Sequence, residues 1–497
     1  MKSKSRRYGA HITGLVAVLL AGLAAPVRAE TVRDGLVLDQ VTVVDVRTGR
    51  LRLHRAVVIA DGKIKRIARA GSVRVSGNAR LVSAGGRFLV PGFNDMHAHN
   101  LNTESPQTSL PLMLAYGVTG FRQMAGSPAL LAARAKGADL LPKDSPALLA
   151  APGLILAGPA FAEPSAVAAE VARQKAEGAD FIKVVDLPHA AFLAAADAAA
   201  AHGLPLAGHL PLSVDARQAM AHHMASIEHL GPTVSLLLNC SRDEAAIRAL
   251  LASAPPGAGG VDFSMEPARM RRMLANPVIM TPPQGFALIR RVLATYDEPK
   301  CRAFAADLAA SQTWIVPTLT RLEAMNLGNT PALRDSPNLA DVPAASRDLW
   351  REVGADFDRT LTEDQRKILA DLFRRQQAMA GLLDQAGVKM LTGTDFGGQW
   401  IAPGVSLHHE FDLLAGAGVS PLRVLQMTTV DPARFLHRET TMGTVETGKN
   451  ADLVLLQDDP TQAVANLHGV VAVVRAGRFH DRADLDAVRG RAEASLR

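Results

Sequence analysis

The sequence is poor in aromatic residues and in cysteine. Of its 497 residues, 4% are aromatic and two are cysteine. No basic cluster is interleaved with aromatic side chains, so a nucleic-acid partner is not expected. The two cysteines are not closely spaced as a pair, which argues against a cysteine metal site. The hydrophobic and charged fractions, 48% and 21%, are those of an ordinary globular protein.

Two sequence motifs are also absent. No Gly-x-Gly-x-x-Gly turn follows an expected strand, which disfavours a doubly wound dinucleotide-binding sheet. No Gly-x-Ser-x-Gly segment occurs either, so the nucleophile elbow of the serine hydrolases is not expected.

No apolar run is long enough to cross a bilayer comfortably, and the longest, residues 12–25, follows a basic N-terminus. Small residues at Val27-Arg28-Ala29 complete the pattern of a signal peptide over residues 1–29. We therefore expect a periplasmic or secreted protein without a stable membrane span after cleavage; the export route stays open. The segment holds five Lys or Arg and no acidic residue, so its removal lowers the net charge from +6 to +1.

The two cysteines, Cys240 and Cys301, lie in one segment of the chain. In an oxidising compartment a disulfide between them can persist and would close a long loop. We expect this bridge; two unpaired thiols are the alternative.

Both ends of the mature chain are rich in β-branched residues. Residues 36–46, 56–69 and 80–90 have the pattern of strands, and so do residues 451–456 and 470–474. Because chain termini often lie close together, we expect residues 30–87 and 439–497 to form one small composite β-sandwich domain.

Between these ends, strands alternate with Ala- and Leu-rich helical stretches. The expected strands are 88–97, 118–123, 152–157, 181–186, 204–209, 225–229, 312–318 and 388–394. This rhythm predicts an α/β fold, a (β/α)8 TIM barrel over residues 88–438. Two segments interrupt it, an insertion at about 231–311 and a shorter one at about 325–345.

Histidines and a carboxylate stand where several of these strands end. His97 and His99 lie two apart, so they share one face of the first strand. Lys183, His209, His229 and Asp395 end later strands, and barrel active sites lie at this rim. Imidazole and carboxylate suit zinc and related divalent metals.

With these motifs the chain resembles the amidohydrolase superfamily, and most closely its imidazolonepropionase-like and prolidase-like dipeptidase groups. The motifs are Pro91-Gly92 before His97-x-His99, Ile182-Lys183, Gly208-His209, Glu228-His229, Gly393-Thr394-Asp395 and residues 443–454. Residues 117–122 and 407–421 support the placement in these groups.

The resemblance implies two divalent metal ions, with zinc expected. It implies that His97, His99 and Asp395 hold one metal, that His209 and His229 hold the other, and that carboxylated Lys183 bridges them. A water shared by the metals would be activated, with Asp395 as catalytic general base. Lys183 lies in the apolar strand 181–186, where an isolated ammonium group is costly to bury. Either the side chain reaches solvent at the strand end, or it is a carbamate, an anion that pairs with the metals.

Two further residues are candidates for substrate binding. The resemblance gives His408 a position that is commonly histidine, in the loop after the last strand; a surface histidine is the alternative. Arg122 ends the second strand and could bind a substrate carboxylate, although a structural ion pair explains it equally well.

The resemblance implies an exported binuclear enzyme that hydrolyses the amide bond of a small molecule, a dipeptide or an N-acyl amino acid. Three alternatives stay open: a lactone or ester hydrolase, a mononuclear imidazolonepropionase- or deaminase-type enzyme, and a metal-free scaffold. Lys183 argues against a mononuclear site, which needs no bridging ligand. A homo-oligomer is neither required nor excluded.

Overall fold

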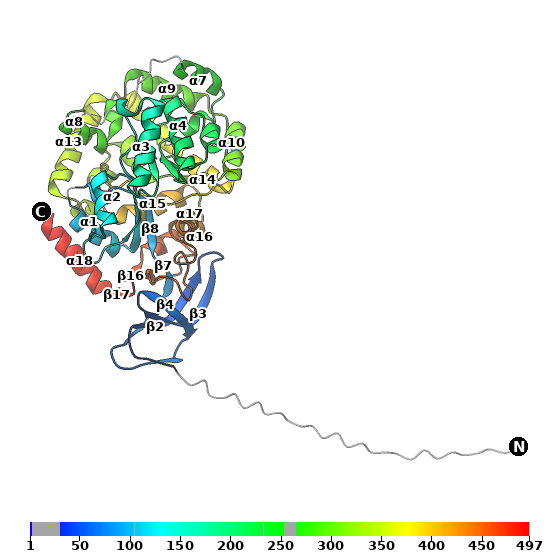
Figure 1. Ribbon diagram of the computed structural model, residues 1–497, viewed down its shortest axis with the longest axis vertical. Helices are drawn as coiled ribbons and strands as arrows, with labels where there is room; N and C mark the ends of the chain where they lie inside the picture. Colours follow the sequence, from blue (N-terminus) through cyan, green and yellow to red (C-terminus); the bar gives the residue numbers. More distant parts are fainter. Residues whose placement is uncertain (2–29, 104, 232, 253–264, 497) are drawn as a thin grey trace.

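The computed structural model describes Met1 and residues 30–103, 105–231, 233–252 and 265–496. The chain has a small β-rich part, which includes β2, β3 and β4, and a larger part in which helices surround strands (Figure 1). The expected signal peptide lies almost wholly outside the described residues.

The small part is built on one mixed eight-stranded sheet. Its order is β17-β16-β15-β7-β2-β3-β4, with β6 beside β2. The strands are β2 (Leu36–Asp45), β3 (Arg50–Ala60), β4 (Lys63–Arg69), β6 (Arg80–Ser83), β7 (Phe88–Pro91), β15 (Leu453–Leu456), β16 (Val470–Arg475) and β17 (Arg478–Asp481). A second, two-stranded sheet pairs β1 (Glu30–Val32) with β5 (Val73–Val75).

Alternation along β2 lets this sheet pack on both faces. Leu36 and Leu38 belong to one apolar cluster, whereas Val37 between them packs with Val73 of the two-stranded sheet. Successive side chains of a strand point to opposite faces, so a run of buried residues in β2 indicates two apolar contacts rather than one.

Strand β7 joins the two ends of the chain. Leu89 pairs with Leu455 of β15 on one side and with Val43 of β2 on the other. The expected single strand at 88–97 is therefore two strands, and residues 88–91 lie in the small sheet rather than in the barrel. The chain changes sheets at Gly92, whose N–H donates to Asp452 while the next N–H donates to Gly117 in the barrel.

The barrel has eight strand positions that close into a ring. The regular strands are β8 (Phe93–Ala98), β9 (Val118–Gln123), β10 (Ala147–Ala150), β11 (Ile182–Val184), β12 (Leu206–Gly208), β13 (Met224–Glu228) and β14 (Trp314–Val316), all parallel to their neighbours. The ring closes through the parallel bridges Ile315–Met390 and Ala98–Phe396.

Two of the expected strands are less regular than the pattern indicated. The third begins earlier, at Ala147, and residues 152–157 contribute only parallel bridges at Pro152 and Leu156. The eighth, 388–394, is held by single backbone hydrogen bonds, such as the one from the Met96 N–H to the Thr392 carbonyl. Proline at 152 and glycine at 393 limit regular strand pairing at both places.

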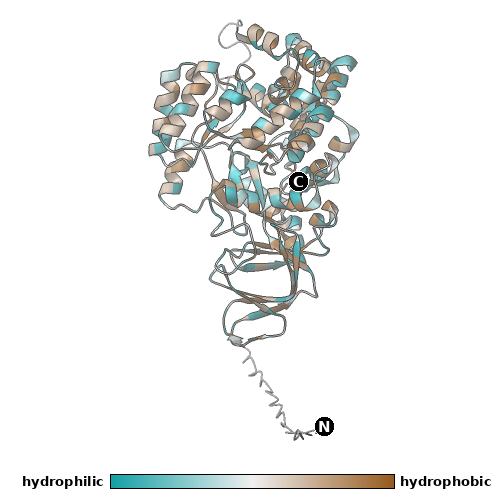
Figure 2. Cartoon of the chain, turned by 90° about the vertical axis from the view of Figure 1, so that its right-hand side faces the viewer, coloured by the Kyte–Doolittle hydropathy of each residue, from teal (hydrophilic) through white to brown (hydrophobic). Residues whose placement is uncertain are grey.

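Helices cover the outside of the ring (Figures 1 and 2). They are α1 (Pro106–Ala115), α2 (Pro128–Ala135), α3 (Pro164–Ala176), α4 (His189–Ala201), α5 (Ala216–Ala221), α6 (Ser235–Leu238), α7 (Glu244–Ala252), α8 (Pro267–Ala275), α9 (Pro283–Ala294), α10 (Glu298–Ala310), α11 (Leu319–Leu327), α12 (Pro331–Arg334), α13 (Ala344–Thr360), α14 (Glu363–Gln385), α15 (Val405–Gly416), α16 (Pro421–Thr428), α17 (Val430–Phe435) and α18 (Arg482–Ser495). Within the described ranges, none combines the length and apolar character that a bilayer crossing requires.

The two parts share one core. Val90 of β7 and Val454 of β15 belong to the same apolar cluster as Phe93 and Phe121 of the barrel. The last helix, α18, packs against α1 of the barrel, with Ala492 and Leu496 against Leu112. Residues 482–495 thus form a helix on the barrel, although the sequence pattern assigned them to the β domain.

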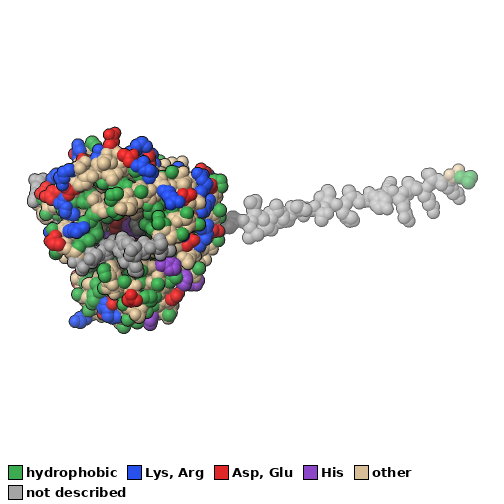
Figure 3. All heavy atoms as spheres, turned by 90° about the horizontal axis from the view of Figure 1, so that it is seen from above, with side chains coloured by type: hydrophobic (Ala, Val, Ile, Leu, Met, Phe, Trp, Pro, Cys, Tyr) green, Lys and Arg blue, Asp and Glu red, His purple; other side chains and the backbone are tan. Residues whose placement is uncertain are grey.

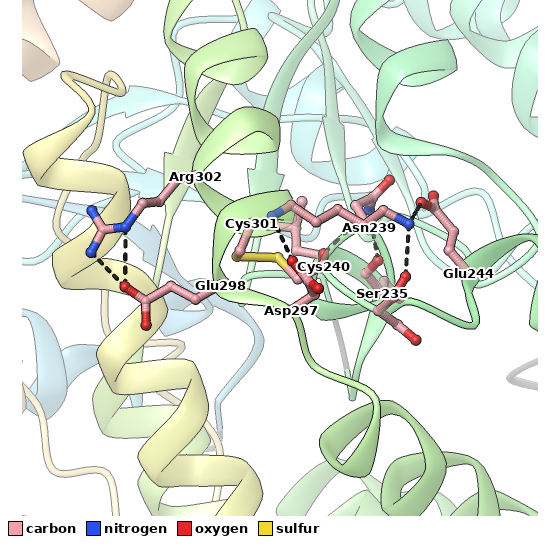
Figure 4. Close-up of a disulfide and its surroundings, with 11 residues drawn as sticks. Ser235, Asn239, Cys240, Glu244, Asp297, Glu298, Cys301 and Arg302 are labelled. Atoms are coloured by element: carbon pink, nitrogen blue, oxygen red, sulfur yellow. Dashed lines mark hydrogen bonds and ion pairs between the residues drawn. A yellow bond between two sulfur atoms is a disulfide. The ribbon is translucent and has the colours of Figure 1, made fainter.

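The long insertion is a cluster of helices between β13 and β14. Cys240 follows α6 and Cys301 lies in α10, and their sulfurs form a disulfide across 61 residues of chain (Figure 4). The Asp297 N–H donates to the Cys240 carbonyl at 2.8 Å, so hydrogen bonding and the disulfide fix the same crossing.

We predict that replacing both cysteines with serine lowers the melting temperature. If the bridge acts by restricting the unfolded chain, opening a loop of this length lowers the free energy of unfolding by about 4 kcal/mol. Differential scanning calorimetry of the variant C240S/C301S checks this, with each single variant as a control. The single variants should melt with the double variant; unchanged melting in all three would contradict a stabilising bridge.

Candidate active site

All six residues expected to bind metal line one cavity at the carboxyl ends of the barrel strands. The cavity has a volume of about 550 Å³. Its lining includes His97 and His99 from β8 and the residue after it, Lys183 from β11, His209 after β12, His229 after β13, and Asp395. The structure therefore brings together the residues that the strand pattern pointed to; their binding of metal stays a prediction.

Three of these residues are close enough to hold one ion. The ligand atoms of His97, His99 and Asp395 all lie within 4.8 Å of one another. The Asp395 Oδ1 atom is 3.2 Å from His97 Nε2 and 3.1 Å from His99 Nε2. Burial lowers the pKa of His99, which favours the neutral imidazole that a metal requires.

The other two histidines continue this arrangement. The His229 ring centroid lies 4.5 Å from that of His97 and 5.0 Å from that of His209. His229 Nε2 is 4.0 Å from Asp395 Oδ2. Burial holds the pKa values of His209 and His229 well below the usual range, so these imidazoles are neutral as well.

Lys183 is the most unusual group in the cavity. Its side chain is 1% exposed, and its Nζ atom has no hydrogen-bond partner among the described residues. Burial lowers its pKa to about 8, against the opposing influence of Glu228 and Asp395. A buried amine of this kind is readily available in its neutral, nucleophilic form.

The backbone is strained at the rim where these side chains emerge. His229, Thr318 and Asp395 have left-handed conformations, with φ of 58°, 46° and 57°. Such conformations are uncommon for non-glycine residues and cluster at functional sites. They turn the chain sharply at the end of its strand and direct the His229 and Asp395 side chains into the cavity.

Glycine before His209 allows a close approach between two strands. Gly208 has φ of 139°, and a Cβ atom there would lie 2.0 Å from the Val184 carbonyl oxygen. Any side chain would push β12 away from β11, and with it His209 away from Lys183. This contact gives the Gly-His motif a physical reason.

A buried carboxylate beneath the cavity orients the first histidine. Glu228 Oε2 lies 2.7 Å from His97 Nδ1, and its other oxygen accepts from Arg122 Nη2 at 2.8 Å. Burial opposes the charge of Glu228, yet Arg122 and His97 outweigh it and hold the pKa below the usual range. The hydrogen bond at Nδ1 fixes the His97 ring so that Nε2 points toward the cavity and Asp395.

His229 is oriented by a hydroxyl in the same way. Thr318 Oγ1 donates to the Pro317 carbonyl at 2.8 Å and lies 2.6 Å from His229 Nδ1. Because that hydroxyl proton is already used, Thr318 accepts the Nδ1–H of His229. The other ring nitrogen of His229, Nε2, faces Asp395 Oδ2 at 4.0 Å.

A second buried carboxylate fixes the end of the ring. Asp95 accepts hydrogen bonds from the His97 N–H and the Thr394 N–H, each at 3.1 Å, and from the Thr394 hydroxyl at 2.6 Å. Burial raises its pKa to about 6, although these donors lower it. Asp95 thus ties His97 to the irregular eighth strand that carries Asp395.

Arg122 is not at the cavity, contrary to its expected role in binding substrate. Its side chain is 1% exposed and lies inside the barrel, where it donates to the Met96 carbonyl, Ser226 and Glu228. The alternative, a structural ion pair, is the one that the structure supports. The buried Glu228 carboxylate explains why: without the guanidinium its charge would lose its ion-pair partner.

His408 is not in a loop at the rim either. It lies in α15, buried, with its Nε2–H donated to the Tyr116 carbonyl at 2.8 Å. Its ring stacks on Phe411 and meets Phe93 edge-on. Burial and the nearby His468 lower its pKa to about 4. It is a packed core histidine, not a surface histidine or a residue that lines the cavity.

One cavity residue escaped sequence analysis altogether. Arg321 of α11 is buried, and its Nε lies 3.1 Å from Asp395 Oδ2. In the sequence, Arg321 is marked only by its position five residues after the seventh strand. That position does not show that its side chain points into the cavity, because the turn at Thr318 cannot be read from the sequence.

The fold and this cavity define a barrel enzyme with its polar groups at the carboxyl ends of the strands. Comparison with known proteins makes the class specific. Residues 317–479, from the end of β14 to β17, match the amidohydrolase family. A search of curated proteins returns no match.

Solved structures share the fold over most of the chain. A bottromycin amidohydrolase is 23% identical, with a TM-score of 0.67 and coverage of 93% of this chain and 90% of that one. A prolidase complexed with N-methylphosphonate-L-proline is 18% identical, with a TM-score of 0.57 and coverage of 90% and 100%. A Xaa-Pro dipeptidase with bound methionine is 16% identical, with a TM-score of 0.56 and the same coverage.

The amidohydrolase match over residues 317–479, together with the fold shared with these structures, confirms the resemblance drawn from the motifs. The expected barrel with an additional domain and the expected enzyme class, a hydrolase of carbon–nitrogen bonds, are confirmed with it.

We predict strong coupling between Arg122 and Glu228. Either R122M or E228Q leaves a buried, uncompensated partner and should cost about 3–5 kcal/mol of unfolding free energy. The double variant should lose clearly less than the sum, as measured by urea denaturation. The exposed pair Arg302–Glu298 is the matched control, with coupling below about 1 kcal/mol. Additive losses at Arg122 and Glu228 would contradict the network.

We predict that His408 makes folding sensitive to mild acid. Its folded pKa of about 4 lies below the unfolded value of 6.5, so the stability is complete above pH 6.5 and declines as the pH falls toward 4. Between pH 8 and pH 5, wild type should lose about 2 kcal/mol more than H408Q. Urea titrations at both pH values measure this, with H202Q at an exposed site as control. Equal losses of unfolding free energy in wild type and H408Q would show that burial does not lower the pKa of His408.

Proposed function

We propose that the protein is an exported binuclear metal-dependent amidohydrolase that cleaves the amide bond of a small substrate, a dipeptide or an N-acyl amino acid. One observation carries the proposal: the unpartnered amine of Lys183 shares a cavity with four imidazoles and the Asp395 carboxylate. A buried amine has no structural use there, but it has one as the precursor of a bridging ligand.

The residues fit a pair of divalent cations by the chemistry of their donors. The Nδ1 atoms of His97 and His229 are engaged by Glu228 and Thr318, so Nε2 is the atom that each ring can offer to a metal. The Lys183 amine can attack the carbon of CO₂, forming an N–C bond and releasing one proton, which converts it into a carbamate anion. With Asp395, that anion would offset much of the charge of two cations.

In this proposal His97, His99 and Asp395 would hold one metal, His209 and His229 would hold the other, and the Lys183 carbamate would be a ligand of both. When bound, the pair supplies a water of lowered pKa and a Lewis acid for the scissile carbonyl. Zinc suits this donor set of imidazole and carboxylate oxygen.

The proton transfers fall to Asp395. Its Oδ1 lies between His97 and His99, and its Oδ2 meets Arg321. Burial opposes the charge of Asp395, but its interactions with His229, His97 and His99 outweigh burial and hold its pKa well below the usual range, so the carboxylate is an anion. We propose that it takes the proton of the attacking water and returns it to the departing nitrogen, so that a neutral amine leaves.

Export is part of the proposal and rests on two features. The first 29 residues have the composition of a signal peptide. The Cys240–Cys301 disulfide suits an oxidising compartment, the periplasm or the exterior.

Metal analysis and a substrate screen test the proposal. The mature protein should contain close to two divalent metals per chain; one metal would favour a mononuclear enzyme and none a scaffold. A library of dipeptides and N-acyl amino acids should include substrates. X-Pro dipeptides come first, because similar folds include a prolidase and a Xaa-Pro dipeptidase. Activity confined to lactones or esters would overturn the amide assignment.

We predict that K183A loses most of its activity and metal, and that short carboxylic acids such as formate or acetate restore part of both. The acid would supply the carboxylate that the carbamate otherwise provides. Metal content by mass spectrometry and turnover of the best amide substrate are the readouts. The control is K175A, an exposed lysine of α3. Full metal content in K183A would refute the bridge.

A further inference from the structure

The two interruptions of the strand–helix pattern meet at the cavity. The insertion supplies Met273 and Leu274 of α8 to its lining. The second interruption supplies Met325 and Val342, and Trp350 of α13 follows it. Segments that are far apart in the sequence and absent from the basic βα repeat thus face the same space. Figure 3, which looks onto the molecule from above, shows a hollow whose margin carries many hydrophobic side chains.

These segments and α11 supply six large apolar side chains to the lining. We call them the apolar wall: Met273, Leu274, Leu322, Met325, Leu349 and Trp350. Leu274 is 48% exposed, and a large exposed leucine beside a cavity marks a surface that a ligand can cover. By contrast, the lining from residues 102–109 is polar, with Ser105 and Thr108 among its side chains.

The wall is fixed to the catalytic centre by Arg321. Its Nη2 and Nη1 donate to the Leu274 and Ala275 carbonyls at 2.8 and 2.7 Å, which satisfies the last turn of α8. Its Nε meets Asp395 at 3.1 Å. A Cβ atom at Gly398 would lie 2.0 Å from Arg321 Nη1, so the backbone there must approach the guanidinium closely.

A second tie holds the two halves of the wall together. Gln399 donates from its backbone to the Ala275 carbonyl at 3.0 Å and from Nε2 to the Trp350 carbonyl at 2.7 Å. Its Oε1 accepts from Asn276 at 3.1 Å. One buried glutamine, four residues after Asp395, therefore joins α8 to α13. The wall is preformed, not assembled by the ligand.

We propose that the substrate carries a bulky apolar group, an aromatic ring or an aliphatic chain of about six carbons or more, on one side of its amide bond. This group packs on the apolar wall while the amide lies at the strand ends. The inference rests on the proposed amide hydrolysis and narrows its substrate class. A substrate with only methyl-sized groups would leave the wall uncovered and gain nothing from it.

Two substrate series test this with the metal-loaded mature protein. The first is N-acetyl-, N-hexanoyl- and N-decanoyl-L-alanine, and the second is N-acetyl-L-alanine, -leucine and -phenylalanine. In one series kcat/KM should rise with apolar size, by up to about fourfold per buried methylene. A flat or falling kcat/KM in both series would overturn the proposal.

A variant of the wall locates the effect. L274A should lower the ratio of kcat/KM between the largest and smallest member of the responding series by about tenfold. The control is L53A, which removes a leucine of similar exposure, 54%, from β3 of the small sheet and should leave the ratio unchanged. An unchanged ratio in L274A, or an equal loss in both variants, would refute the role of the wall.

Binding to the metal-free protein separates this proposal from the proposed reaction. Trp350 reports on the wall, so N-decanoyl-L-alanine should change tryptophan fluorescence at a concentration at least about tenfold lower than N-acetyl-L-alanine, and L274A should reduce the difference. Preferential binding without any amide cleavage would sink the proposed function and keep the wall. Amide cleavage without size preference in rates or binding would support the proposed function and refute the role of the wall.

Discussion

Glu228 is the buried charge on which the rest of the site depends. It receives the Nδ1–H of His97 on one oxygen and the Arg122 guanidinium on the other, with all three side chains inside the barrel. Each member would be costly to bury alone, because an uncompensated interior charge has lost its hydration. Together they form a network in which the rotamer and tautomer of His97 are set before any ligand arrives. His97 is therefore held in one orientation, and His99, His229 and Asp395 lie around its ring.

The closure of the barrel is the second constraint, and it is achieved with little regular structure. The eighth strand position is joined to its neighbours by bridges and single hydrogen bonds, yet it carries Asp395. Asp95 compensates, since its carboxylate binds Thr394 of that segment and the backbone of His97. The irregular backbone permits the left-handed conformation of Asp395. The hydrogen bonds of Asp95 hold this segment in a defined position. Thr394, which Asp95 binds, thus fixes the segment, while the next residue, Asp395, has the strained backbone conformation.

The sequence predicted which polar residues lie at the rim of the barrel. Parallel strands end at one face of a barrel, so polar residues at the ends of the predicted strands lie close together. The sequence could not predict which strand-end side chains turn inward. Arg122 ends a strand as His97 does, but its partners Ser226 and Glu228 lie on a strand about a hundred residues later. His408 was placed in a loop, whereas the structure has it in a helix whose buried face is set by Phe93. Arg321 follows a strand by an unusual turn, and no periodic pattern encodes such a turn.

The insertions show how such a barrel can acquire specificity without disturbing its chemistry. The strand ends are fixed by buried networks that tolerate little change, so variation in what is bound must come from segments added outside them. An added segment is useful only if it holds a defined position relative to the reacting atoms. Arg321 provides that position, because one guanidinium binds the end of α8 and the Asp395 carboxylate together. A displacement of α8 would therefore be transmitted to Asp395, so the apolar wall and the Asp395 carboxylate should move together rather than independently.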